Sequence, residues 1–151
     1  AIGKLVLWSS KPGLVDDKGD ILRSSKIQRI AMANPKLAPY GVATMETLNQ
    51  LGLWPALQPK LVLGENITQA YQFAATGNAQ LGFVALSQVY ADGKLTSGSV
   101  WRVPATLYSP IRQDAVLLNK GQNKPAPQAL LTYLKGAKAK AIIQSYGYDL
   151  P

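Results

Sequence analysis

Short apolar runs alternate along the chain with segments whose apolar residues recur at helical spacing. Strands are predicted for the runs at 4–8, 29–33, 60–63, 81–85 and 100–103. The run at 112–118 is the longest and predicts a further strand. Strands that alternate with helices indicate an α/β sheet with crossover connections, and such sheets bind ligands at the carboxyl ends of their strands.

Helical spacing marks two internal segments and two terminal segments. The first internal helix is predicted over 41–51, and the second begins after Asn66, a suitable N-cap residue, and covers 67–74. Near the C-terminus, apolar residues share one helical face over 126–134 and again over 139–146. A glycine follows each of these two series, and they predict a pair of packed terminal helices.

Two loops, at 34–41 and 64–68, each carry the chain from a predicted strand into the start of a predicted helix. The first N–H groups of a helix have no partner within it, and together with the helix dipole they form an anion site that needs no basic side chain. A small oxyanion would fit between the two helix starts if they converge. Ordinary capping by Asn66 and helix initiation at Pro39 explain the same residues, so both interpretations stay open here.

Composition indicates an ordinary globular domain whose basic charge fits either an anionic partner or a solvated surface. The chain has 151 residues, of which 47% are hydrophobic and 16% charged, which is enough for one domain with its own core. No apolar run reaches the roughly 18 residues of a membrane helix, and the start lacks the features of a signal peptide. The net charge of +8 favours anions. Nucleic acid is not expected, because most lysines are scattered and no aromatic and basic stripe is present.

The residue types needed for most enzyme chemistry are missing. The chain has no cysteine and no histidine, which excludes thiolate nucleophiles and the commonest general base and metal ligand. Asp16, Asp17 and Asp20 form an acidic loop but lack the spacing of a calcium site. No paired glutamates and no serine-nucleophile motif occur. We therefore expect a protein that is not an enzyme and that has no catalytic residue, metal site or cofactor.

Five stretches that together span nearly the whole chain carry a resemblance to a known family: AIGKLVLWSSKPGLVD, IAMANPKLAPYGVATMETLNQLGLW, LVLGENITQAYQFAATGNAQLGFVALSQV, PIRQDAVLL and YLKGAKAKAIIQSYGYDLP. In these stretches the chain resembles the periplasmic molybdate-binding proteins of molybdate ABC transporters, which are type II periplasmic solute-binding proteins. The resemblance implies two α/β lobes joined by crossing strands, with a tetrahedral oxyanion between them. Residues 1–110 would form the second lobe, and 111–151 a crossing strand and C-terminal helices that return toward the first lobe.

The resemblance also implies the binding residues. In the family, backbone N–H groups at two helix starts hold the anion, and these positions match Tyr40 in APYG and Ile67 in GENI. The residues expected to line the site are Pro39, Gly41, Asn66 and Ala85. Some members contribute a tyrosine hydroxyl at the position of Ala85, so that contact is absent or replaced here.

Function and location follow from the same resemblance. The expected protein is exported to the periplasm, binds molybdate or tungstate, and delivers it to a membrane permease. Family members begin with a further stretch that this chain lacks, which implies a truncated form that binds weakly or not at all. Residues from Ile111 onward would then pack abnormally, stay flexible or exchange with a neighbouring chain in a swapped homodimer.

Two other functions are open from the residues. One is a receptor for sulfate, phosphate or another anion. The other is the effector-sensing domain of a transcription regulator, which uses the same fold, although the chain shows no helix-turn-helix segment.

Overall fold

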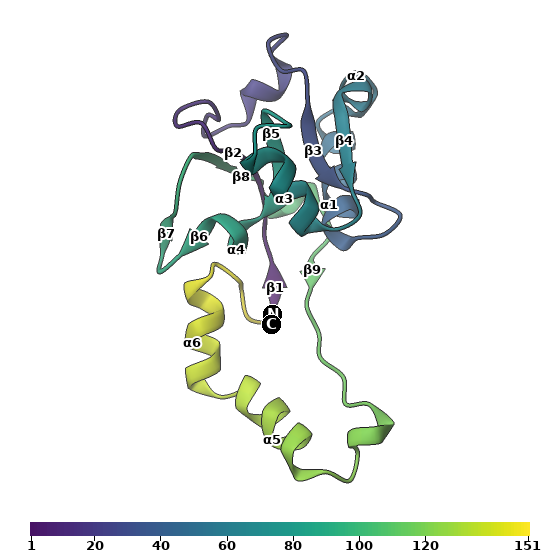
Figure 1. Ribbon diagram of the computed structural model, residues 1–151, viewed down its shortest axis with the longest axis vertical. Helices are drawn as coiled ribbons and strands as arrows, with labels where there is room; N and C mark the ends of the chain where they lie inside the picture. The colour runs from purple at the N-terminus through teal and green to yellow at the C-terminus, as the bar shows by residue number, and fades with distance from the viewer.

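The computed structural model describes all 151 residues and contains an α/β body built on a five-stranded sheet (Figure 1). The strand order is β4-β3-β5-β2-β8. β3 runs parallel to β4 and β5, whereas β2 runs antiparallel to β5 and β8. The carboxyl ends of β3, β4 and β5 therefore meet at one edge of the sheet. The strands are β2 (Leu5–Ser9), β3 (Ile30–Ala33), β4 (Leu61–Gly64), β5 (Leu81–Ala85) and β8 (Ser99–Arg102).

The two long helices of the body, α1 (Pro39–Gln50) and α3 (Ile67–Ala75), cover opposite faces of this sheet. Successive strand residues point to opposite faces, and β2 shows this directly. Its Leu5 and Leu7 share one core cluster with residues of α1, while Val6 and Trp8 share a second cluster with Ala74 of α3.

Shorter elements connect the strands and helices of the body. Two helices of four residues, α2 (Trp54–Leu57) and α4 (Leu86–Val89), follow α1 and β5. A small hairpin of β6 (Tyr90–Ala91) and β7 (Lys94–Leu95) precedes β8. Three 3₁₀ turns complete the body: η1 (Asp20–Arg23), η2 (Gln58–Lys60) and η3 (Ala105–Leu107). No helix in the structure has the length and apolar character needed to cross a membrane.

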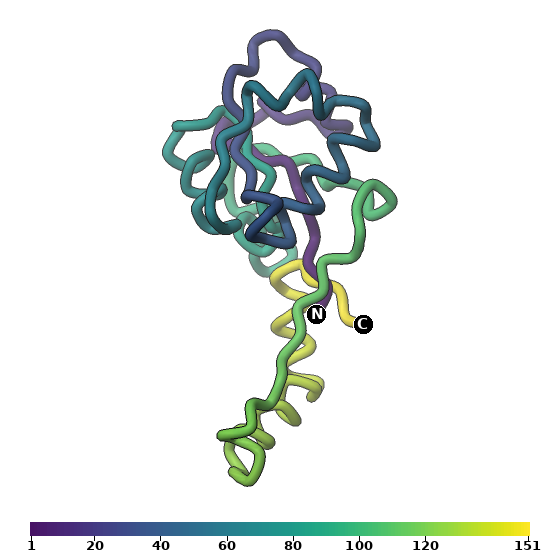
Figure 2. Tube along the Cα trace, turned by 90° about the vertical axis from the view of Figure 1, so that its right-hand side faces the viewer, coloured from purple at the N-terminus to yellow at the C-terminus, as the bar shows by residue number.

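A narrow joint lies below the body where three segments meet side by side. β1 (Ile2–Gly3) pairs antiparallel with β9 (Ile111–Arg112). On its other side, Ile2 exchanges two backbone hydrogen bonds with Asp149, of 2.8 and 3.0 Å. The Asp149 carboxylate also lies 2.7 Å from the ammonium of Lys4. We call these segments, Ile2–Gly3, Ile111–Arg112 and Asp149, the joint; both chain termini lie beside it (Figures 1 and 2).

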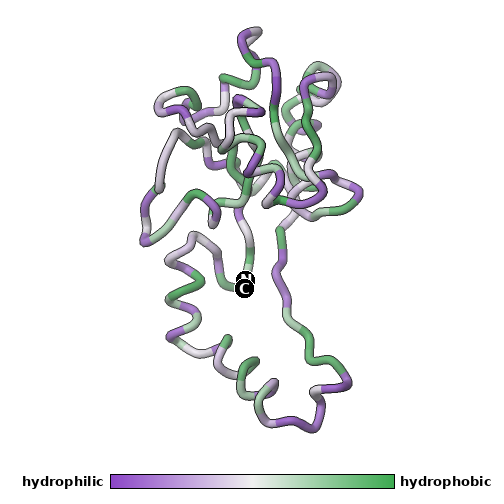
Figure 3. Tube along the Cα trace, viewed as in Figure 1, coloured by the Kyte–Doolittle hydropathy of each residue, from purple (hydrophilic) through white to green (hydrophobic).

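Residues 113–148 form an arm that leaves the body through the joint (Figure 2). It contains η4 (Asn119–Gly121), α5 (Pro125–Leu134) and α6 (Ala137–Ser145). α5 has no buried residue, and α6 has only Ala139. Hydrophobic residues nevertheless recur along the arm (Figure 3). The large exposed ones are Val116, Leu118, Leu130, Tyr133, Leu134, Ile142 and Tyr146.

The strand prediction for this region is wrong. The strand predicted over 112–118 is limited to Ile111–Arg112, and beyond it Val116 and Leu118 are 81% and 70% exposed. An apolar run becomes a strand when a neighbouring strand and a core cover it, and the arm offers neither. The two terminal helices form where they were expected and contact each other, although few of their residues are buried. The division into 1–110 and 111–151 as parts of two lobes stays a prediction.

The exposure of the arm leads to an expected hydrogen-exchange result. Local opening is easiest where few apolar contacts are buried. Amides of α5 and α6 should therefore exchange on the order of 100-fold faster than those of β2, β3 and β5. Exchange followed by mass spectrometry of peptides from the two regions checks this. Equal protection in both regions would mean that the arm is covered in solution.

Candidate functional site

The start of α1 presents one free backbone donor at the end of β3. Pro39, its first residue, has no N–H group, and the N–H of Gly41 donates to the carbonyl of Ala38 at 3.0 Å. The N–H of Tyr40 has no acceptor within the protein. The free Tyr40 N–H therefore lies at the positive end of the α1 dipole.

Gly41 allows α1 to begin directly against the end of β3. A Cβ atom on Gly41 would collide with the carbonyl oxygen of Ala33 and lie 2.7 Å from the carbonyl carbon of Asn34. Both are backbone atoms that cannot rotate away. The absence of a side chain at this residue therefore fixes how closely the Tyr40 N–H approaches the sheet edge.

The start of α3 is capped in a way that leaves other donors free. The Asn66 side chain accepts from the N–H of Gln69 at 3.0 Å, and the Gln69 side chain accepts from the N–H of Glu65 at 2.7 Å. The predicted capping role of Asn66 is confirmed. The Asn66 side chain caps the N–H of Gln69 and not those of Ile67 and Thr68. These two N–H groups have no acceptor in the protein.

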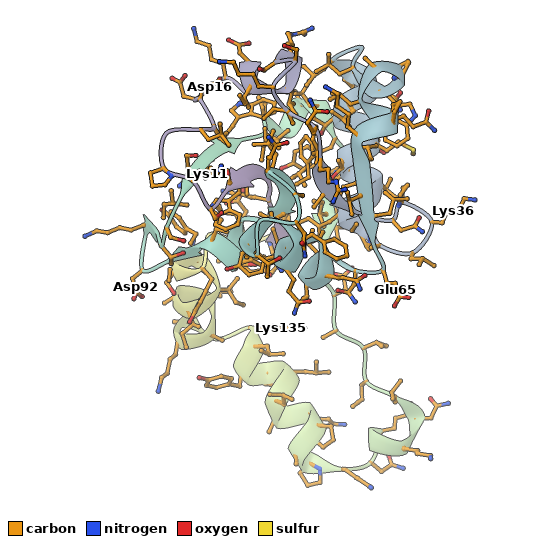
Figure 4. The ribbon with its side chains drawn as sticks, turned by 45° about the horizontal axis from the view of Figure 1, so that its top comes forward. Lys11, Asp16, Lys36, Glu65, Asp92 and Lys135 are labelled. Carbon is orange, nitrogen blue, oxygen red and sulfur yellow. The ribbon has the colours of Figure 1, made fainter.

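The two helix starts lie at the same edge of the sheet. β3 and β4 are parallel neighbours in which Ala33 is opposite Gly64, and the N–H of Asn34 donates to the carbonyl of Gly64 at 2.7 Å. This bond ties the loop before α1 to the loop before α3. Lys36 and Glu65 mark these two loops in Figure 4. The structure thus places the free N–H groups of both helices on one edge.

Ala85 ends β5 at this edge as well, although it offers no free donor. Ala85 is buried, and its N–H donates to the side-chain oxygen of Gln88 at 3.0 Å. The Gln88 amide nitrogen in turn donates to the carbonyl of Ile67 at 3.3 Å. Gln88 therefore links the end of β5 to the start of α3, and a lining role for Ala85 stays a prediction.

A cluster of three tyrosines, Tyr40, Tyr108 and Tyr148, lies between this edge and the joint. The Tyr40 hydroxyl is buried and has no hydrogen-bond partner. Burial raises the pKa of Tyr40 above its ordinary value, and the nearby Tyr148 and Tyr108 raise it further. The Tyr108 oxygen accepts from the N–H of Leu5 at 3.1 Å. The Tyr148 oxygen accepts from the Ser87 hydroxyl at 2.9 Å.

Sequence reasoning missed this cluster. Its members come from α1, from the segment after η3 and from the C-terminal tail, so no local spacing relates them. Tyr40 was selected for its backbone alone.

The acidic loop at 16–20 has a structural use. The carboxylate of Asp16 accepts from the N–H groups of Lys18, Asp20 and Ile21, at 2.9, 2.9 and 2.8 Å. Partial desolvation opposes ionisation of Asp16, but these hydrogen bonds outweigh it and hold the pKa below its ordinary value. Asp16 thereby closes the turn that leads into η1.

Asp16→Asn is expected to lower the free energy of unfolding by about 1 kcal/mol at pH 7, because a carboxylate accepts these bonds better than an amide does. The folded-state pKa is lowered, so this contribution is present above the unfolded pKa of about 4 and disappears as the pH falls below it. Urea unfolding of both proteins at pH 7 and pH 3 measures the difference. A gap that persists unchanged at pH 3 would contradict this account.

Comparison with known proteins assigns the family. The model for the bacterial extracellular solute-binding protein family matches residues 1–149. The chain belongs to this family.

The relatives within and near the family are longer than this chain. The molybdate-binding protein ModA of Azotobacter vinelandii is 61% identical over 150 residues, which cover 99% of this chain and 60% of the relative. The ModA of Rhodobacter capsulatus is 54% identical over 98% of this chain and 57% of the relative. The chain thus spans about 60% of the length of these two relatives.

Solved structures agree with the family assignment. The periplasmic molybdate-binding protein of Azotobacter vinelandii superimposes with a TM-score of 0.94 and 45% identity, covering all of this chain and 66% of that one. The substrate-binding domain of a putative molybdenum ABC transporter from Clostridium difficile gives a TM-score of 0.72 at 23% identity, over 99% of this chain and 64% of that one, and shows the shared fold alone. The predicted α/β fold of type II periplasmic binding proteins is confirmed.

Proposed function

We propose that this chain binds a tetrahedral oxyanion, molybdate or tungstate, through the backbone N–H groups of Tyr40 and Ile67. The observation that carries the proposal is that these donors have no acceptor in the protein and lie on one sheet edge at the starts of two helices. Pro39, Gly41 and Asn66 surround them. The names of the family members from Azotobacter vinelandii and Rhodobacter capsulatus support the choice of anion.

Selectivity would come from geometry. Backbone donors that belong to helices are held in place by the packing of α1 and α3 against the sheet, so they cannot adapt freely to an anion of another size. Molybdate and tungstate are alike in size, while sulfate and phosphate are smaller. Neutral donors also add no fixed charge that would hold every anion equally.

The wider role that we propose is that of a periplasmic solute-binding protein that hands the anion to an ABC transporter permease and catalyses no reaction. We assign residues 1–110 to one lobe and 111–151 to the part that reaches toward a first lobe. The arm supports this assignment, because its large apolar side chains are exposed and a neighbouring lobe would cover them. The exposed side chains of the arm could instead be covered by a second copy of this chain. Analytical ultracentrifugation tests this alternative: a dimer would support a swapped homodimer, and a monomer would oppose it.

A thermal-shift titration of the full chain with molybdate, tungstate, sulfate and phosphate at matched ionic strength tests the proposal. Ligand at 100 times its Kd stabilises the folded state by about 2.7 kcal/mol. We expect molybdate and tungstate alone to raise Tm. Equal shifts with all four anions would support a general anion receptor, and no shift would refute binding by this chain while leaving its family membership intact. Binding to duplex DNA at physiological salt would instead favour a regulator domain.

A further inference from the structure

We propose that the Tyr40 side chain couples the joint to the start of α1. Its ring rests against the joint and thereby fixes the position of the Tyr40 N–H. Tyr40 carries the only free N–H of that helix start, and its ring reaches the strands of the joint. A displacement of these strands would therefore move the donor. The consequence for anion binding rests on the function proposed above, whereas the mechanical coupling does not.

Gly3 of β1 provides the first contact. A Cβ atom on Gly3 would collide with the Tyr40 hydroxyl and lie 3.0 Å from the ring carbon that bears it. The phenol therefore occupies the space that a side chain on β1 would fill. Only glycine at this residue lets β1 pass so close to the end of the ring.

Ile111 of β9 provides the second contact region. The Cγ2 atom of Ile111 lies 3.5 Å from the same Cβ position on Gly3, and Ile111 shares a core cluster with Tyr40. Gly3 and Ile111 are paired residues of the two antiparallel strands. The end of the Tyr40 ring thus rests against a β1–β9 pair.

Packing, rather than a short hydrogen bond, places the end of the Tyr40 ring. The Tyr40 hydroxyl is buried and has no hydrogen-bond partner within 3.5 Å, although the Tyr148 hydroxyl is close enough to raise its pKa. The Tyr108 oxygen accepts from the N–H of Leu5, and the Tyr148 oxygen accepts from the Ser87 hydroxyl. Shape complementarity against the joint therefore sets the position of the ring, and a change of one methyl group on β1 should be enough to disturb it.

The helix carries this position to the binding edge. The ring and the free N–H belong to the same residue, in the first turn of a helix of 12 residues. Gly41, directly after it, packs against the backbone at the end of β3. The α3 donors have no comparable contact, because the atoms nearest to a Cβ on Gly3 belong to Tyr40 and Ile111 and none belongs to α3. The coupling should therefore affect one helix start and spare the other.

Gly3→Ala, Tyr40→Phe and the double variant test the coupling in the full chain. In ¹⁵N-labelled protein without anion, we expect Gly3→Ala to shift the amide signals of Tyr40 and Gly41 and to leave those of Ile67 and Thr68 in place. Molybdate affinity should fall about 10-fold, since small misplacements of binding groups have effects of this order. Adding Tyr40→Phe removes the colliding oxygen, so the double variant should recover most of both changes. Gly121→Ala, in the arm, is the matched control and should alter neither.

The outcomes separate this proposal from the proposed function. If the wild-type chain binds no anion but the Tyr40 and Gly41 signals move and are rescued, the coupling stands and the binding function fails. Signals that stay in place, or a shift without rescue, overturn the coupling. A rescued shift with unchanged molybdate affinity overturns its role in binding. If Gly3→Ala does not fold, Ile111→Leu removes the Cγ2 methyl that lies beside Gly3 at similar side-chain volume, and it should move the same two signals to a smaller extent.

Discussion

Ile67→Pro is expected to weaken molybdate binding by about 100-fold, because it removes one backbone donor to a doubly charged anion. Proline has no N–H group, and no other donor of α3 would take the place of the one that is lost without a shift of the helix. Isothermal titration of the wild type and the variant with molybdate measures the change. This is the largest effect on binding that we expect from a single substitution.

The variant should fold, because proline suits this place in the chain. Ile67 is the first residue of α3, where proline is favoured and where its N–H group makes no bond in the protein. Asn66 before it is extended, with φ −148° and ψ 174°, as a residue that precedes proline must be. Ile67→Ala is the matched control, since it shortens the side chain but keeps the donor. If both variants lose affinity equally, the side chain and not the N–H group is what matters.

Gly41→Ala should lower the free energy of unfolding by about 3 kcal/mol, which is the largest loss of stability that we expect from a single substitution at the binding edge. The new methyl group would meet the backbone of Ala33 and Asn34, which cannot move without disturbing β3. Guanidinium unfolding followed by tryptophan fluorescence measures the loss.

Gly121→Ala serves as the control for the Gly41 variant. There the nearest atoms to the added methyl belong to the side chains of Leu117 and Pro127, at 3.1 and 3.4 Å. We expect a change within about 0.5 kcal/mol for this control. A Gly41 variant as stable as the control would show that α1 is free to lift away from β3, and the fixed position of the Tyr40 donor would then be refuted.

Much of the body could be predicted from the sequence because its signals are local. Apolar runs that end at turn residues give β2, β3, β4 and β5 nearly at their observed bounds. Asn66 and Pro39 mark the starts of α3 and α1, and the free donors follow from helix geometry once those starts are known. Tyr40 and Ile67 could therefore be selected before their surroundings were known, with help from the family resemblance.

The remainder depends on contacts between distant segments. The joint combines residues 2–3, 111–112 and 149, and two-residue strands leave no periodic pattern in a sequence. The same holds for the tyrosine cluster. The strand prediction in the arm failed for the opposite reason. The apolar pattern is clear, but such a pattern indicates only that a face is covered and does not identify the element that covers it. That is why 112–118 was predicted as a strand and is not one.

The central claim is that backbone donors at two helix starts hold the anion, and an amide-resolved titration tests it most directly. We would add molybdate to ¹⁵N-labelled chain and follow every backbone amide, with sulfate at the same ionic strength as the reference. The account predicts saturable shifts at Tyr40, Ile67 and Thr68 with molybdate and none with sulfate. Shifts confined to the lysine-rich arm, or equal shifts with both anions, would contradict it.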